Sequence, residues 1–303
     1  MSAAAPLSPG QRRQLIGLTL GAVAVFAVFR WLPTGTNLSH GDFRLEGDNV
    51  LEFCDPAAPQ FLPVTTARSP VIFEISPASV ATGAMKTFTL RLATSSGKPI
   101  GPVDLLVAHT RKLHVMVVDP TLRDYQHVHP EPTATAGEWT VSFAPRLAGA
   151  YRIFADFTPA ATARGLYASA ELTVPGDVAV NPIITNWTAE VGSFRFELRP
   201  DALPVRARET TRLTFAIRAA DGADIALGEV MGAFAHLVAF DRERSGFAHL
   251  HPLETDLAQP PSAAEPDLHF QVTIPDPGLY VIWAQLVLDG TETFVPFWFE
   301  VEP

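Results

Sequence analysis

Cysteine is nearly absent from this chain, which has 1 cysteine, Cys54, among 303 residues. A single cysteine cannot form a disulfide within the chain, so a disulfide-stapled scaffold is excluded. We interpret Cys54 as a buried, inert thiol; a metal ligand and an intermolecular disulfide are the alternatives. Tyrosine is also scarce, with 4 residues, whereas the 27 prolines indicate many turns.

Positive charge is also limited, because 22 Lys and Arg stand against 32 Asp and Glu and give a net charge of -10. Nucleic acids and anionic membrane surfaces bind clustered positive charge, which the chain lacks. The short pair Arg111-Lys112 is typical of an exposed strand edge, where basic side chains discourage edge pairing. Nucleic acid is therefore not expected as a partner.

Enzyme signatures are missing too. The chain has no Gly-x-Ser-x-Gly elbow, no phosphate-binding loop and no Cys-x-x-Cys-His haem attachment. His127-Val128-His129 is similar to the His-Val-His of copper-zinc superoxide dismutases, but the rest of that ligand pattern is absent. Glu131 and Glu254 lie too close to the preceding histidines for a cupin site. We predict that the protein is not an enzyme.

Only one long uncharged run is present, from Leu15 to Phe29, between Arg13 and Arg30. Its 15 residues span about 22 Å as a helix, against a hydrocarbon core of roughly 30 Å. Snorkelling by Arg30 and an interfacial Trp31 would lengthen the span. We therefore expect a transmembrane anchor at residues 14–33 that contacts the lipid bilayer; a cleaved signal peptide is the alternative.

The double arginine Arg12-Arg13 predicts the orientation of this anchor, because basic residues favour the cytoplasmic side. Residues 1–13 would then be a cytoplasmic N-terminus, and the chain after Pro33 would lie in the periplasm. The expected localisation is the inner (cytoplasmic) membrane, as a single-pass protein.

The most informative motif present is His-x12-His-x-His-Pro, which occurs twice with a constant offset of 122 residues. The repeat extends beyond the histidines, since residues 73–77 match 196–200 and residues 149–155 match 278–284. Each repeated unit exceeds a hundred residues, so the units are duplicated domains. The two sets of motif histidines are His114, His127 and His129, and His236, His249 and His251.

Alternating apolar residues dominate each unit, for example in residues 87–92, 138–143 and 268–274, and helical periodicity is scarce after residue 33. This pattern predicts an all-β fold with two tandem antiparallel β-sandwiches of immunoglobulin or cupredoxin type. We place the sandwiches at residues 69–176 and 183–303, after a linker segment at 34–68.

The first motif is typical of one hairpin, with Asp119 and the following residues forming its turn. A turn centred between Thr121 and Leu122 places His114 opposite His129 and Met116 opposite His127. Strand alternation then directs all four side chains to one face of the sheet. Imidazole with thioether is a ligand set suited to copper, and imidazoles alone can hold zinc or copper. Asp156 is the expected fourth group.

The second motif gives the same pairing, with His236 opposite His251 and Val238 opposite His249. The thioether is lost there, and Gln285 replaces Asp156, so domain 1 is the stronger metal candidate. The alternative is that these histidines are hydrogen-bonded residues of a half-buried sheet. Asp119 and Asp241 would then be their partners, or would simply cap the turns.

Three segments, Leu113–Val118, Gln126–Glu131 and Gly149–Phe157, together resemble the YtkA-like secreted bacterial β-domains. The resemblance covers roughly residues 100–160, and more faintly the second unit. It implies an extracytoplasmic β-sandwich and suggests copper. The chain departs from the metal modules that accompany this family, because no Cys-Pro-Met-His-Pro segment lies upstream.

Two functions follow from these observations. We favour a structural or accessory subunit of a membrane complex, photosynthetic or respiratory, that requires no cofactor and has the other subunits as partners. The alternative is a periplasmic copper- or zinc-binding protein that uses the histidine clusters. Aromatic residues near the C-terminus could supply the subunit interface, although alternate members of a terminal strand normally face the core; they are Phe294, Phe297, Trp298 and Phe299.

Overall fold

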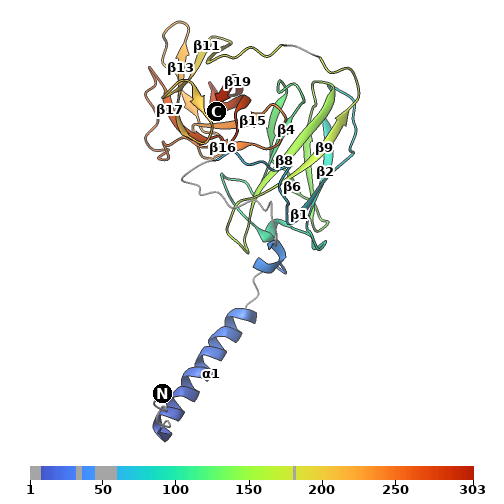
Figure 1. Cartoon of the computed structure of the whole chain (residues 1–303), viewed down its shortest axis with the longest axis vertical. Helices are drawn as coiled ribbons and strands as arrows, with labels where there is room; N and C mark the ends of the chain where they lie inside the picture. Colours follow the sequence, from blue (N-terminus) through green and yellow to red (C-terminus); the bar gives the residue numbers. More distant parts are fainter. Residues whose placement is uncertain (1–7, 32–35, 45–59, 180–181) are drawn as a thin grey trace. The chain divides into compact units, whose positions relative to one another are not determined.

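The computed structural model describes residues 8–31, 36–44, 60–179 and 182–303. Cys54 lies outside these ranges, as does Asn181 between the two predicted domains. The chain divides into two compact units, Met1–Asn37 and Leu38–Pro303 (Figure 1). Each unit is described by itself.

The first unit contains one helix, α1 (Pro9–Trp31). No helix within the described residues is long and apolar enough to cross a membrane. The predicted transmembrane anchor at residues 14–33, and the inner-membrane localisation that depended on it, are therefore wrong. The reason is that Arg12 and Arg13 occupy the first turns of α1, which leaves an uncharged stretch of only about 22 Å.

The first domain of the second unit is a sandwich of two antiparallel sheets. Alternate apolar residues of each sheet, such as Phe88 and Val115, meet in a shared core. Short 3₁₀ helices, η1 (His40–Phe43) and η2 (Pro102–Asp104), lie at its edges. One sheet has the order β1 (Val71–Ser76), β2 (Lys86–Thr94), β7 (Glu138–Phe143), β6 (Glu131–Pro132). The other has the order β3 (Leu105–Leu106), β8 (Gly149–Pro159), β4 (Leu113–Val118), β5 (Tyr125–Val128), with β9 (Leu166–Val174) paired to β8.

The second domain repeats this arrangement around its own core, which includes Phe215 and Phe297. One sheet has the order β10 (Thr188–Val191), β11 (Phe194–Pro200), β13 (Thr210–Ala219), β17 (Asp267–Thr273). The other has the order β12 (Val205–Arg206), β19 (Thr291–Glu302), β18 (Gly278–Leu288), β15 (Ala235–Asp241), β16 (Ala248–Leu250), with β14 (Leu227–Gly228) paired to β18. The prediction of two repeated, mostly antiparallel β domains is confirmed.

Both histidine hairpins have the predicted register. Met116 pairs with His127 between β4 and β5, and Val238 pairs with His249 between β15 and β16. Asp119 caps the first turn, because its carboxylate accepts hydrogen bonds from the backbone N–H groups of Thr121, Arg123 and Asp124 at 2.7–2.8 Å. The turn-capping role is thereby confirmed for Asp119.

The two sandwiches pack against each other through the outward faces of their hairpin sheets. Strand β4 is buried along its whole length. Val115 and Val117 face the domain 1 core, whereas Met116 and Val118 join a third apolar cluster with Phe240 of the other domain. Figure 1 shows β4 and β8 beside β15 and β16. We call this third cluster the interdomain core; it brings the two histidine faces together.

The C-terminal aromatics are used inside the molecule. Phe297 and Phe299 are buried in the domain 2 core, and Phe294 and Trp298 pack against the interdomain core. Phe297 and Phe299 thus face the core, as expected for alternate members of a terminal strand, whereas Phe294 and Trp298 are half-buried. A partner at this strand stays a prediction.

Residues just before domain 1 also join the interface. Leu62 exchanges two backbone hydrogen bonds with Phe247, of 2.9 and 3.1 Å, and packs in the interdomain core with Val64. The contact is close enough that a Cβ atom on Gly246 would lie 1.6 Å from the Leu62 carbonyl oxygen. Part of the segment predicted as a linker at 34–68 thus pairs with domain 2.

Candidate metal centre between the two domains

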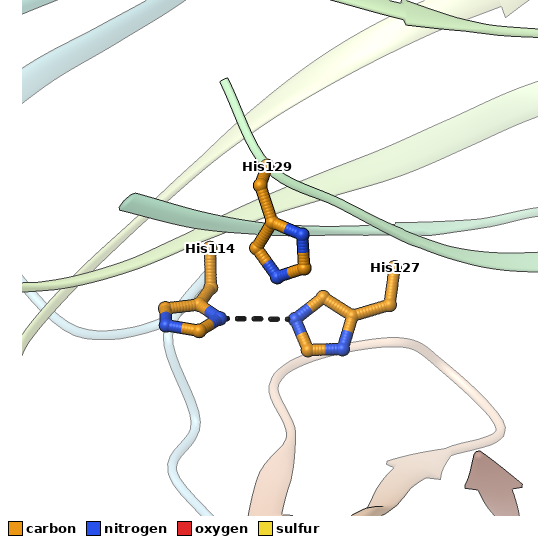
Figure 2. Close-up of side chains that lie close together, drawn as sticks. All are labelled: His114, His127 and His129. Carbon is orange, nitrogen blue, oxygen red and sulfur yellow. Dashed lines mark hydrogen bonds between the residues drawn. The ribbon is translucent and has the colours of Figure 1, made fainter. Parts of the chain in front are cut away.

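Each hairpin holds its three histidines together on the face that meets the other domain. His114 lies on β4, His127 on β5, and His129 directly after β5. One ring nitrogen from each of these histidines lies within 4.8 Å of the others, and the three rings point toward one another (Figure 2). His236, His249 and His251 form the same arrangement in domain 2. We call these groups triad 1 and triad 2; each can hold a metal ion.

In triad 1, one ring nitrogen of His114 and one of His127 donate hydrogen bonds to groups outside the triad. We call these the outer nitrogens. His114 Nε2 donates to the carbonyl oxygen of Ala108 at 2.9 Å. His127 Nδ1 donates to Gln285 Oε1 at 2.9 Å, and the Gln285 amide nitrogen donates in turn to Glu292 at 2.7 Å. These partners fix the tautomers, because a neutral imidazole carries one N–H and one lone pair.

The other ring nitrogen of each of these two histidines, the inner nitrogen, therefore carries no hydrogen when the rings are neutral. The two inner nitrogens face each other. His114 Nδ1 and His127 Nε2 are 3.3 Å apart, the contact drawn in Figure 2. Both atoms carry lone pairs when the two rings are neutral, so they repel one another unless a cation lies between them.

Triad 2 repeats this pattern. His236 Nε2 donates to the carbonyl oxygen of Val230 at 3.0 Å, and His249 Nδ1 donates to Asp156 Oδ2 at 3.2 Å. The remaining nitrogens, His236 Nδ1 and His249 Nε2, are 3.2 Å apart. His251 adds a buried Nε2 atom that has no hydrogen-bond partner among the described residues.

Two of these partners are exchanged between the domains. Asp156 lies opposite His114 on β8, yet its carboxylate contacts His249 of domain 2. Gln285 lies opposite His236 on β18, yet its amide contacts His127 of domain 1. Asp156, which was predicted to be the fourth group of triad 1, thus accepts a hydrogen bond from a histidine of triad 2. Each of these two side chains therefore contacts a histidine of the opposite domain.

The thioether beside triad 1 is also supplied by the other domain. Met231 Sδ lies 2.9 Å from His129 Nε2. Met116, the methionine predicted from the hairpin pattern, is fully buried in the interdomain core with Val118 and Val238. We assign Met116 to apolar packing.

Met231 is carried by a tight turn that has an equivalent in domain 1. Val230 and Ala233 exchange two backbone hydrogen bonds around Met231, and Ala108 and Arg111 do the same around His109. The tip residues of both turns have positive φ, at 51° for Met231 and 47° for His109. The two turns are offset by 122 residues, so His109 and Met231 occupy equivalent positions.

His109 reaches triad 2 as Met231 reaches triad 1. Its ring stacks on His251, with centroids 3.7 Å apart and planes at 17°, and lies 6.0 Å from His236. Sequence reasoning missed His109 and Met231, because their side chains differ and neither belongs to the motif. The constant offset was the signal that could have paired them.

Burial shapes the electrostatics of the cluster. Desolvation, followed by repulsion from His114 and Arg111, lowers the pKa of His129 to about 4. Desolvation, followed by repulsion from His109, lowers the pKa of His236 to about 3. The pKa values of the buried His127 and His249 lie well below the ordinary value for the same causes. Burial raises the pKa of Asp156. The histidines are therefore neutral at pH 7, which is the form that binds metals.

Comparison with known proteins identifies a family for the domain. A family model described as "Domain of unknown function (DUF8832)" matches residues 67–174 and 189–303. No curated protein matches the chain. The resemblance to YtkA-like domains stays a prediction.

Several solved structures are similar to the chain at low identity. The Escherichia coli adhesin FdeC is 14% identical, with 77% of this chain and 64% of that chain covered and a TM-score of 0.23. A DUF4785 family protein from Legionella pneumophila is 9% identical, with 77% and 56% covered and a TM-score of 0.26. The fibronectin(III)-like modules of Clostridium thermocellum CbhA are 13% identical, with 77% and 94% covered and a TM-score of 0.19. The matched part is less than two thirds of the adhesin and Legionella chains.

The two regions that match the family model together make up well over half of the 303 residues. The chain therefore belongs to the DUF8832 family and carries two copies of its domain.

Proposed function

We propose that this protein is a non-catalytic metal-binding protein that holds copper or zinc ions between its two β-sandwich domains, one ion at each histidine triad. The observation that carries the proposal is the pair of facing lone-pair nitrogens in each triad. Imidazole nitrogens are the ligands that copper and zinc share.

The spacing of these nitrogens fits a metal ion. Two nitrogens bound at about 2.0–2.1 Å to a tetrahedral ion are separated by about 3.3 Å. The observed separations are 3.3 Å in triad 1 and 3.2 Å in triad 2. Both triads therefore have the spacing that two equivalent metal sites would require.

The hydrogen bonds behind the triads support the same function. Histidines that bind metals usually donate their other N–H to a carbonyl or carboxylate, which fixes the tautomer and the ring orientation. Ala108 and Gln285 accept from triad 1, and Val230 and Asp156 accept from triad 2. The alternative of satisfied core histidines accounts for these outer bonds but leaves the inner nitrogens unpaired.

Metal analysis of the full chain tests this function. We expect the metal-stripped protein to take up about two equivalents of zinc or copper, and His127→Ala and His249→Ala each to lose about one. His269→Ala is the matched control, because His269 is outside the cluster and its Nδ1 pairs with Glu254. Uptake below about a tenth of an equivalent by the unaltered chain would overturn the proposal.

The accessory-subunit hypothesis stays a prediction. Of the aromatics that suggested an interface, Phe297 and Phe299 are buried in the domain 2 core, and Phe294 and Trp298 are half-buried. Co-purification from cells would test it, and a lone, monodisperse monomer would count against it.

A further inference from the structure

We propose that the exchanged turn tips make the two sites chemically different: Met231 completes triad 1 as a Cu(I) site, whereas triad 2 keeps an open coordination position beside His109 and binds a divalent ion. This inference rests on the proposed function, since it requires that the triads bind metal. It assigns to Met231 and His109 roles that the histidine motif does not contain.

The first argument for a Cu(I) site is the position of the Met231 sulfur. His129 points its ring between His114 and His127 (Figure 2), and Met231 Sδ lies 2.9 Å from His129 Nε2. The Met231 sulfur is thus a fourth donor atom beside the three imidazole nitrogens of triad 1. A soft thioether selects Cu(I) over harder divalent ions.

The second argument is the charge of the groups around triad 1. The groups that accept hydrogen bonds from the triad 1 histidines are uncharged, since His114 donates to the Ala108 carbonyl and His127 donates to the Gln285 amide. The Asp156 carboxylate lies opposite His114 on β8, but it bonds to His249 of triad 2. An ion held by neutral ligands is less unfavourable to bury when it is monovalent. The hydrogen-bonded groups of triad 1 thus agree with the preference of the thioether for Cu(I).

Triad 2 differs in this charge. His249 is backed by the Asp156 carboxylate, at 3.2 Å, in place of an amide. A carboxylate behind a metal-binding histidine makes the ring more basic and supplies negative charge, which favours a divalent ion. Asp156, a residue of domain 1, thus adds negative charge beside the site of domain 2.

Triad 2 also differs in its fourth position. The residue equivalent to Met231 is His109, and it presents the face of its ring to His251, with centroids 3.7 Å apart. In this pose His109 does not join the group of converging nitrogens, which among the described residues consists of His236, His249 and His251. A site with three protein ligands keeps an open position for water or an exchanging ligand. His109 itself is exposed.

Copper(I) competition on the full chain tests the assignment. We expect one Cu(I) to be retained against a chromogenic Cu(I) chelator, and Met231→Leu to weaken that retention by about 10- to 100-fold while zinc uptake is unchanged. Met116→Leu is the matched control, because it removes the other buried thioether near triad 1 and should leave Cu(I) retention as it is. Asp156→Asn should weaken zinc binding at one site by about 10- to 100-fold and spare Cu(I).

X-ray absorption of the unaltered protein loaded with one equivalent of Cu(I) keeps the test independent of folding defects. A sulfur scatterer at about 2.3 Å is expected in the unaltered protein and in Met116→Leu. Its absence, or an unchanged Cu(I) affinity in a folded Met231→Leu protein that still binds zinc, would overturn this inference and leave the proposed function standing. Failure of the unaltered chain to bind any metal would overturn both.

Discussion

Triads 1 and 2 lie on equivalent hairpins with the same histidine spacing, yet the neighbours that complete them differ. A methionine and an amide from domain 2 reach triad 1, whereas a histidine and a carboxylate from domain 1 reach triad 2. The duplication preserved the hairpins, while the residues that contact the opposite domain diverged. Residues of the opposite domain thus contact both triads, so the packing of the domains decides the surroundings of each triad.

The largest expected effect comes from breaking the interface that both triads share. Phe240→Ala removes a fully buried ring from the interdomain core and should lower the free energy of unfolding by about 3–5 kcal/mol. Urea unfolding measures this change. Both triads should lose metal affinity together. Loss of affinity at triad 2 alone, the triad of the domain that carries Phe240, would contradict a shared interface. Phe154→Ala gives the same test from the domain 1 side.

The next effect separates the two triads. Gln285→Ala leaves the buried Nδ1–H of His127 without an acceptor, which should lower the free energy of unfolding of the metal-free protein by about 1–3 kcal/mol. Metal affinity should fall at triad 1 and stay the same at triad 2. The control is Glu292→Gln, which retains an oxygen acceptor for the Gln285 amide. Equal loss at both triads would contradict the exchange of partners.

Acidification should weaken the metal-free fold through the histidines. The pKa of His236 is lowered to about 3 in the folded protein, whereas the unfolded value is near 6.5, so below pH 6.5 protons bind preferentially to the unfolded chain. The stability is thus present above pH 6.5 and is lost as pH falls toward 3, by up to about 1.4 kcal/mol per pH unit for each such histidine. Denaturation followed from pH 7 to pH 4 measures the slope. His236→Gln should flatten it, and an unchanged slope would contradict the neutral state of this ring.

The smallest effect concerns the two turns. Thr110 has φ of 67° beside His109, a conformation that a β-branched side chain rarely adopts, whereas domain 2 has Gly232 at the equivalent position. Thr110→Gly should therefore stabilise the protein by up to about 1 kcal/mol, measured by thermal unfolding. Thr110→Ala, which keeps a Cβ atom at positive φ, is the comparison. A loss of stability in the glycine variant would mean that the Thr110 side chain makes a contact more valuable than the strain it carries.

Much of the fold followed from local patterns. Strand alternation predicted the all-β sandwiches, and the turn at Asp119 predicted the pairing of Met116 with His127. The membrane anchor was predicted wrongly because a run of 15 uncharged residues was extended by snorkelling. The contacts of Asp156 and Met116 did not follow from the sequence. Both residues lie near the motif histidines in the same sheet, but position within a sheet does not tell which side chain contacts the opposing sheet.

The sequence by itself determined which histidines share a face, because side-chain direction in a paired strand alternates with a fixed period and the turn sets the register. Only the tertiary structure decided what lies across from that face. The docking of two sheets joins residues more than 90 positions apart, such as Asp156 with His249 and His129 with Met231. No periodicity encodes such contacts, because they depend on how two complete domains pack against each other.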